Sequence, residues 1–173
     1  EIKGGVQVGF SGLTFLNTSL RLVDAVVIAS DVVFAETKRV ALNIELLNLH
    51  RFELSLKNVV FRQNAGCIII DAEQSIISVS ITNTTFYENG EFSSNTTSIL
   101  WLNSTINLIN IQIRNCVFKK NRFRGHGMIE VINGKGTTIL LINQLKMEEN
   151  EHINPSIKAY DGLFVLVSSR LFI

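Results

Sequence analysis

The chain repeats one short pattern, in which an anchor residue, phenylalanine or methionine, closes a run of alternating apolar and polar residues. Before Phe86, for example, the apolar Ile77, Val79 and Ile81 alternate with serine and threonine. This alternation predicts a strand with one buried face, because successive side chains of a strand point to opposite sides. Seven anchors recur at spacings of 19, 27, 25, 32, 29 and 25 residues: Phe15, Phe34, Phe61, Phe86, Phe118, Met147 and Phe172.

Polar residues, mostly amides, recur at two fixed distances from the anchors. Stacked asparagines can hydrogen-bond to one another and to backbone groups at corners, which would otherwise lack partners. We therefore expect one phenylalanine stack and two inward-facing ladders. Three residues before the anchors stand Asp31, Asn58, Asn83, Asn115 and Gln144, and three residues after them stand Asn64, Asn89, Asn121 and Asn150.

Further apolar segments lie between the anchors: GCIIID at 66–71, SILWLN at 98–103 and GMIEVIN at 127–133. Two or three short strands per repeat predict an all-β parallel solenoid of about seven coils, in which each coil pairs with its neighbours. Residues 1–173 would form a single domain, either a segment of a longer solenoid or a self-stacking unit. A leucine-rich repeat horseshoe is the alternative, but its shorter, more constant period is absent.

The segments SITNTTFYEN, NIQIRNCVFKKN and ELSLKNVVFRQN carry a resemblance to a known family. They resemble the repeats of right-handed parallel β-helix proteins of the pectin-lyase-like superfamily, above all the non-catalytic Phe-x-x-Asn type of adhesin-like and cell-surface proteins. The resemblance implies a right-handed β-helix. It implies little about function, because that superfamily includes lyases, hydrolases, adhesins and structural fibres.

Composition narrows the classes of partner. Only 18% of residues are charged and the net charge is +1, which argues against a nucleic-acid binder. No apolar run is long enough for a membrane-spanning helix. Four Asn-x-Ser/Thr sequons favour an extracellular or cell-surface glycoprotein. We expect glycans on Asn17, Asn95 and Asn103, and an unmodified Asn83, because Asn83 aligns with the ladder residues Asn58 and Asn115, which lack sequons.

The sequence offers no convincing reaction, cofactor or metal site. Gly-His-Gly around His126 resembles part of the polygalacturonase active site, but the clustered aspartates that glycosidic cleavage needs are missing. His50, His126 and His152 show no ligand spacing. A basic loop at 119–124 could meet an acidic polysaccharide, although a solvated corner is the simpler interpretation.

Of the two cysteines, Cys67 follows the anchor Phe61 and Cys116 precedes the anchor Phe118. In a coiled arrangement they would stand two levels apart, about 10 Å, which is beyond the reach of a disulfide. We expect two buried free thiols.

Both ends of the sequence continue the repeat without a polar or helical cap, and outward positions become apolar near them, as at Ile28 and Leu141. Uncapped ends and apolar patches predict contacts with further copies of the chain or with neighbouring coils. The leading hypothesis is an extracellular structural or adhesive protein, such as a fibre or surface-layer component. The alternative is a carbohydrate-binding or polysaccharide-degrading protein.

Overall fold

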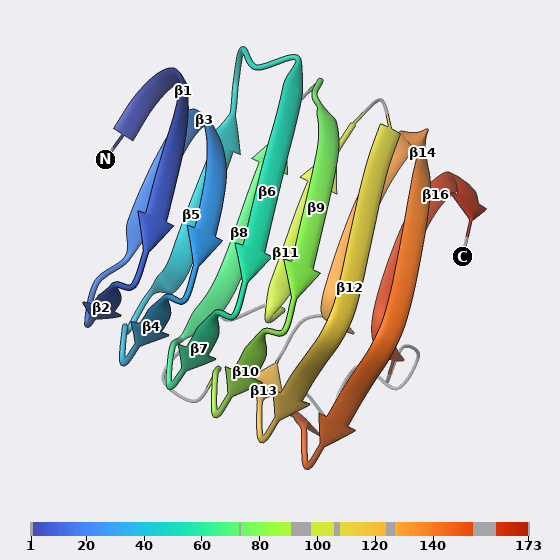
Figure 1. Cartoon of the computed structure of the whole chain (residues 1–173). Helices are drawn as coiled ribbons and strands as arrows, with labels where there is room; N and C mark the ends of the chain where they lie inside the picture. The colour runs from blue at the N-terminus through green and yellow to red at the C-terminus, as the bar shows by residue number, and fades with distance from the viewer. Residues whose placement is uncertain are drawn as a thin grey trace.

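A computed structural model describes residues 2–72, 74–90, 98–105, 108–123, 127–153 and 162–172, and it describes side chains for those of them that lie between residues 6 and 153. Every regular element in these ranges is a strand, so the protein is all-β, and every paired strand runs parallel to its neighbours (Figure 1). The abundance of Ile, Val, Thr and Phe explains this preference, because branched and aromatic side chains pack well on a pleated surface.

The strands lie in three rows (Figure 1). The front row contains β1 (Ile2–Ser11), β3 (Leu20–Ser30), β6 (Arg51–Lys57), β9 (Ile76–Thr82) and β12 (Leu108–Lys119). Behind it lie β5 (Val40–Leu46), β8 (Gly66–Ala72), β11 (Leu100–Ser104) and β16 (Gly162–Phe172). A lower row of short strands contains β2 (Thr14–Leu16), β4 (Val33–Ala35), β7 (Val60–Arg62) and β10 (Thr85–Tyr87). The long β14 (Gly127–Glu148) crosses all three rows, and β13 (Arg122–Phe123) pairs with β15 (Glu151–His152).

The hydrogen-bonded pairing closes on itself. Eight strands form a ring in the order β14-β11-β8-β5-β3-β6-β9-β12, and β12 pairs back to β14. Closure depends on two long strands. β3 pairs with β5 through Leu20–Val23 and with β6 through Val27–Ser30, and β14 pairs with β11 through Ile129–Asn133 and with β12 through Thr137–Glu148.

This closure corrects the expected fold. The sequence predicted an open right-handed parallel β-helix of about seven coils with uncapped ends, similar to the pectin-lyase-like superfamily. That prediction is wrong, because a shared strand joins the front and back rows at each end and the pairing forms a ring. The pairing instead defines a closed, all-parallel β-barrel of eight strands with further strands outside it. The sequence pattern could not reveal this closure. It shows which residues face inward, but it does not show that one strand pairs with different neighbours along its length.

Within the barrel, successive repeats lie side by side in the register that the anchors define. Val27 pairs with Leu54, Leu54 with Val79, and Val79 with Ile111. All four side chains are buried and belong to one core. The alternating burial along β6 and β9 places the intervening polar residues on the outer face.

The anchors stack in the core below the front row. Adjacent rings of Phe15, Phe34, Phe61, Phe86 and Phe118 have centroids 4.3–5.1 Å apart and planes within 16° of parallel. This distance matches the spacing of paired strands, so strand pairing itself aligns the rings. Met147 follows Phe118 in the same register and packs against the core.

The sequence pattern placed the last anchor, Phe172, in the wrong row of strands. Phe172 pairs through its backbone with Ile139, not with Met147. The preceding residues 163–167, expected beside 138–142, pair with 128–132 along the first part of β14. A short apolar alternation is common to the front and back rows, so the pattern alone does not distinguish them.

The inner asparagine ladder consists of Asn64, Asn89, Asn121 and Asn150, of which the first three are fully buried. Asn89 Oδ1 accepts hydrogen bonds from the backbone N and the Nδ2 of Asn64, at 3.0 and 3.1 Å. Asn89 Nδ2 donates to Phe61 O and to Asn121 Oδ1, both at 2.9 Å. The ladder therefore ties each corner to the next repeat and to the backbone of an anchor.

Candidate functional site

A second column of polar residues lies on the outside of the corner between the front and lower rows. We call it the outer amide column: Asp31, Asn58, Asn83, Asn115 and Gln144. All five residues have φ between 51° and 57°, the left-handed region, and all five are exposed. Asn83 Nδ2 donates to Asn58 Oδ1 at 3.2 Å, and Asn58 Nδ2 donates to Asp31 Oδ1 at 2.9 Å.

The expectation that this column faces inward is wrong. A left-handed residue interrupts the alternation of a strand, so counting in steps of two no longer gives the side to which its side chain points. The residue after each corner points inward instead, as fully buried Val59, Thr84 and Cys116 show. Asn83 was expected to be unmodified because its side chain would point inward. The side chain is exposed, so that argument against a glycan no longer holds.

The sequons differ in their surroundings. Asn17 and Asn83 are exposed corner residues with φ of 53° and 51°. Asn103 is half-buried within β11, where its Nδ2 donates to Asp71 Oδ1 at 3.0 Å. Asn95 lies outside the described residues.

An acidic groove of about 290 Å³ follows the outer side of the back row. We define it by Glu45, Asp71, Asn103 and Thr105, which line it. Glu45 and Asp71 are register partners on β5 and β8, so the two carboxylates stand on adjacent strands. Arg21 holds Glu45 through two hydrogen bonds of 2.9 and 2.7 Å. Paired carboxylates beside an amide offer hydrogen-bond acceptors to the hydroxyl groups of a sugar.

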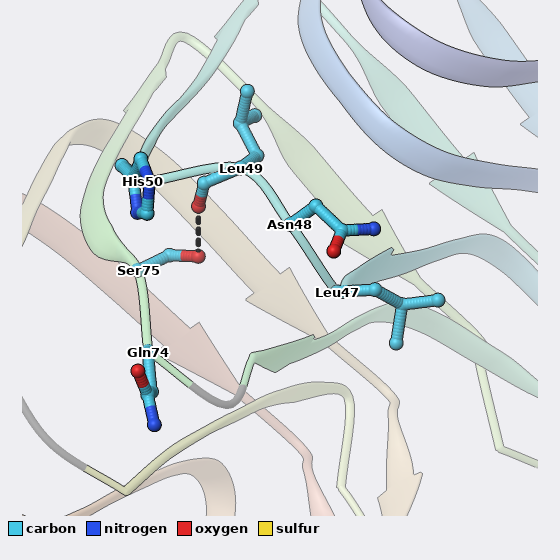
Figure 2. A pocket seen from close by; sticks show the side chains of 6 residues that line it. All are labelled: Leu47, Asn48, Leu49, His50, Gln74 and Ser75. Carbon is cyan, nitrogen blue, oxygen red and sulfur yellow. Dashed lines mark hydrogen bonds between the residues drawn. The ribbon is translucent and has the colours of Figure 1, made fainter.

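A second cavity, of about 410 Å³, lies over the turn between β5 and β6 and contains His50 and Ser75 (Figure 2). These residue types suggest a nucleophile and its base, but the geometry does not match. The Ser75 hydroxyl donates to the carbonyl oxygen of Leu49, as Figure 2 shows, and not to the imidazole of His50. Activation of a serine requires a hydrogen bond from its hydroxyl to the base, here the imidazole.

The same turn is held by Asp24, a buried residue of β3 with φ of 51°. Asp24 Oδ1 accepts the backbone N–H groups of Leu47, Asn48 and Leu49 at 2.7, 2.9 and 3.2 Å. Burial raises the pKa of this carboxyl, but the hydrogen bonds from Asn48, Leu47 and Leu49 outweigh burial, and the net pKa lies below its ordinary value. Asp24 is thus a structural acceptor for the turn, not a proton donor.

The basic loop is paired with the following repeat. Lys119, Lys120 and Arg122 approach Glu148, Glu149 and Glu151 at 3.1, 3.9 and 2.9 Å. Exposed pairs of this kind contribute little stability, about 0–1 kcal/mol each, but they neutralise the positive charge that an acidic polysaccharide would recognise. Arg124 and His126 lie outside the described residues.

The cysteines and histidines supply no further site in the described part of the chain. Cys67 and Cys116 are buried free thiols, and burial raises the pKa of each. His50 and His152 belong to no group of three or more potential metal ligands within the described ranges. Phe123 instead packs against the His152 ring, with centroids 5.0 Å apart.

The spacing of the repeats does not reveal two features of the structure, the buried acceptor Asp24 and the acidic groove. Asp24 has a signal in the sequence, because it is a lone acidic residue within the apolar run LVDAV. Glu45 and Asp71 have none, because they are distant in the sequence and meet only through the pairing of β5 with β8.

Searches of protein-family models, of curated proteins and of solved structures each found no match to this chain. Within the described residues, no helix is long and apolar enough to cross a membrane.

Proposed function

We propose that this chain is an extracellular structural or adhesive glycoprotein module. The observation that carries the proposal is the unbroken stack of five phenylalanine rings beside a buried asparagine ladder. Such a core makes each repeat depend on its neighbours and produces a stiff body. A stiff body suits a protein that holds surfaces at a fixed spacing.

The outer surface of the front row supports this role. Ser55, Ser78 and Ser80 form its centre, between the exposed apolar side chains of Ile28 and Leu141. Short hydroxyl side chains project little from the sheet, so another large surface can approach it closely. The partners that we propose are further copies of the chain and extracellular glycans.

The proposal is tested by secreting the chain from eukaryotic cells behind a signal peptide. Light scattering after size-exclusion chromatography and negative-stain microscopy should reveal concentration-dependent assemblies. Replacing Ser78 by Arg on the front face should disrupt these assemblies, whereas replacing Glu53 by Gln on the same row should not. Monodisperse particles that degrade a polysaccharide would refute the structural role.

The acidic groove favours one second candidate function, carbohydrate binding or cleavage. Two adjacent carboxylates are the minimum that glycosidic hydrolysis requires, at about 5–9.5 Å from each other. Isothermal titration with a panel of neutral and acidic oligosaccharides tests binding. The variants Glu45→Gln and Asp71→Asn should abolish it, and Glu53→Gln serves as the matched control outside the groove. Binding that survives both groove substitutions would exclude this candidate.

A further inference from the structure

We propose that Asn83 is an N-glycosylation site, so that a glycan projects from the outer amide column. The proposal rests on the proposed function in one respect, namely that the chain passes through a secretory pathway. It reverses the expectation from the sequence, in which the alignment of Asn83 with Asn58 and Asn115 of other repeats predicted an unmodified residue.

The position of Asn83 makes its amide accessible. The residue lies in the bend between the end of β9 at Thr82 and the start of β10 at Thr85. Its side chain is exposed, and so are its neighbours in the column, Asn58 and Asn115. A sugar attached here therefore extends from an edge of the barrel, not from the interior of a sheet face.

The chemistry preserves the local hydrogen bonds. In glycosylation a bond forms between Asn83 Nδ2 and the anomeric carbon of the sugar, the bond from that carbon to the pyrophosphate of a lipid-linked donor breaks, and the amide loses one proton. Asn83 Nδ2 carries two hydrogens, so one remains to donate to Asn58 Oδ1, now at 3.2 Å. The backbone N–H of Asn83, which donates to Arg114 O at 3.0 Å, takes no part.

The order of events also follows from the structure. Thr84 is fully buried and its hydroxyl donates to Thr82 O, while Thr85 is half-buried in β10. The transferase must read the threonine of the sequon, so the sugar is added before this corner folds. The folded chain then accepts the product because only Asn83, and not the threonines, has to remain at the surface.

The repeat provides an internal test of this reasoning. Asn58 occupies the equivalent corner, with φ of 55°, and Val60 is the register partner of Thr85. Replacing Val60 by Thr completes a sequon at Asn58 without moving a charge or a buried group. In the opposite direction, Thr85→Val removes the sequon at Asn83 but keeps the shape and the strand preference of the side chain.

The experiment measures site occupancy in chain secreted from eukaryotic cells, by mass spectrometry of peptides after enzymatic deglycosylation in heavy-oxygen water. We expect label at Asn83 in the parent chain, loss of one glycan in Thr85→Val with an unchanged melting temperature, and one additional glycan, at Asn58, in Val60→Thr.

Three results overturn the inference, and each can be distinguished from the others. An empty Asn83 in chain that carries glycans on Asn17 or Asn103 refutes the site alone and leaves the proposed secretion intact. Absence of glycan from every sequon of chain that was directed into the secretory pathway refutes both the site and the proposed glycoprotein. A folded, secreted Val60→Thr variant without glycan at Asn58 would show that the corner geometry does not permit the modification.

Discussion

Replacing Asn89 by Ala is the most direct test of how the repeats are held together. Asn89 is fully buried, and its side chain has four hydrogen-bonding partners: the backbone N and the Nδ2 of Asn64, the carbonyl of Phe61 and the Oδ1 of Asn121. Two of these partners retain another bond in the variant, because Asn64 Nδ2 also donates to Phe34 O and Asn121 Oδ1 also accepts the backbone N of residue 89.

The magnitude follows from the other two partners. The backbone N of Asn64 and the carbonyl of Phe61 lose the side-chain bond that Asn89 supplies. Asn64 N is left unsatisfied, which costs about 1–3 kcal/mol, whereas Phe61 O lies in the paired strand β7 and loses one bond worth about 0.5–1.5 kcal/mol. The free energy of unfolding should therefore fall by about 1.5–4.5 kcal/mol. For a domain of this size each kcal/mol lowers the melting temperature by about 2–4 °C.

The assay is chemical denaturation followed by circular dichroism, with Asn110→Ala as the matched control. Asn110 Oδ1 is buried without a hydrogen-bond partner, so its removal should cost less than about 1 kcal/mol. Asn89→Asp adds a second test, because its carboxylate would face Phe61 O and Asn121 Oδ1. That repulsion is present while the carboxyl is ionised and is relieved at low pH, when the protonated group can donate. Equal losses of stability in Asn89→Ala and Asn110→Ala would refute the ladder as a stabilising element.

Further predictions concern the core, the turn, one corner and the thiols. Phe118→Ala should lower the free energy of unfolding by about 3–5 kcal/mol, because the ring is fully buried and stacks on Phe86 at 4.3 Å; unchanged melting would exclude the stack. Asp24→Gly should cost about 1.5–3 kcal/mol at pH 7 without adding backbone strain. In the parent chain the part of this contribution that depends on the ionised carboxylate is present at neutral pH. It is lost as the pH falls from about 3.9, the pKa of unfolded Asp, through the lower folded-state pKa; a loss in the variant that does not shrink as the pH falls below 3.9 would contradict it. Gly90→Ala should prevent normal folding, because its Cβ would meet Arg122 O at 1.6 Å; a soluble variant with parental melting would show that the corner can move. Cys67 and Cys116 should react with a thiol reagent only after denaturation, because both are buried; rapid labelling of the folded chain would contradict their placement.

Local pattern was enough to define much of the core. Period-two alternation identified which residues of β6, β9 and β12 face inward, and the anchor spacing matched their pairing in the barrel. The asparagines three residues after the anchors lie in the inner ladder for the same reason, since an amide at a buried corner must find partners. These features depend on neighbours in sequence or on one repeated distance.

The residue pattern did not predict the candidate sites. Asn83 was assigned to the interior by alignment, but its φ of 51° turns the side chain outward, and alternation gives no sign of a left-handed residue. Glu45 and Asp71 form the acidic groove only because β5 pairs with β8. A pattern within one strand contains no information about the strand beside it.

The sequence by itself determined that this chain is all-β and repetitive, with aromatic anchors and buried amides, because side-chain periodicity and the needs of buried polar groups are local properties. Only the tertiary structure decided that the strands close into a ring, since β3 and β14 each pair with different neighbours along their lengths. It also decided that Phe172 joins another row and that Asn83 faces solvent. Closure and corner direction depend on where the backbone bends, and a bend of one left-handed residue leaves the apolar pattern on either side unchanged.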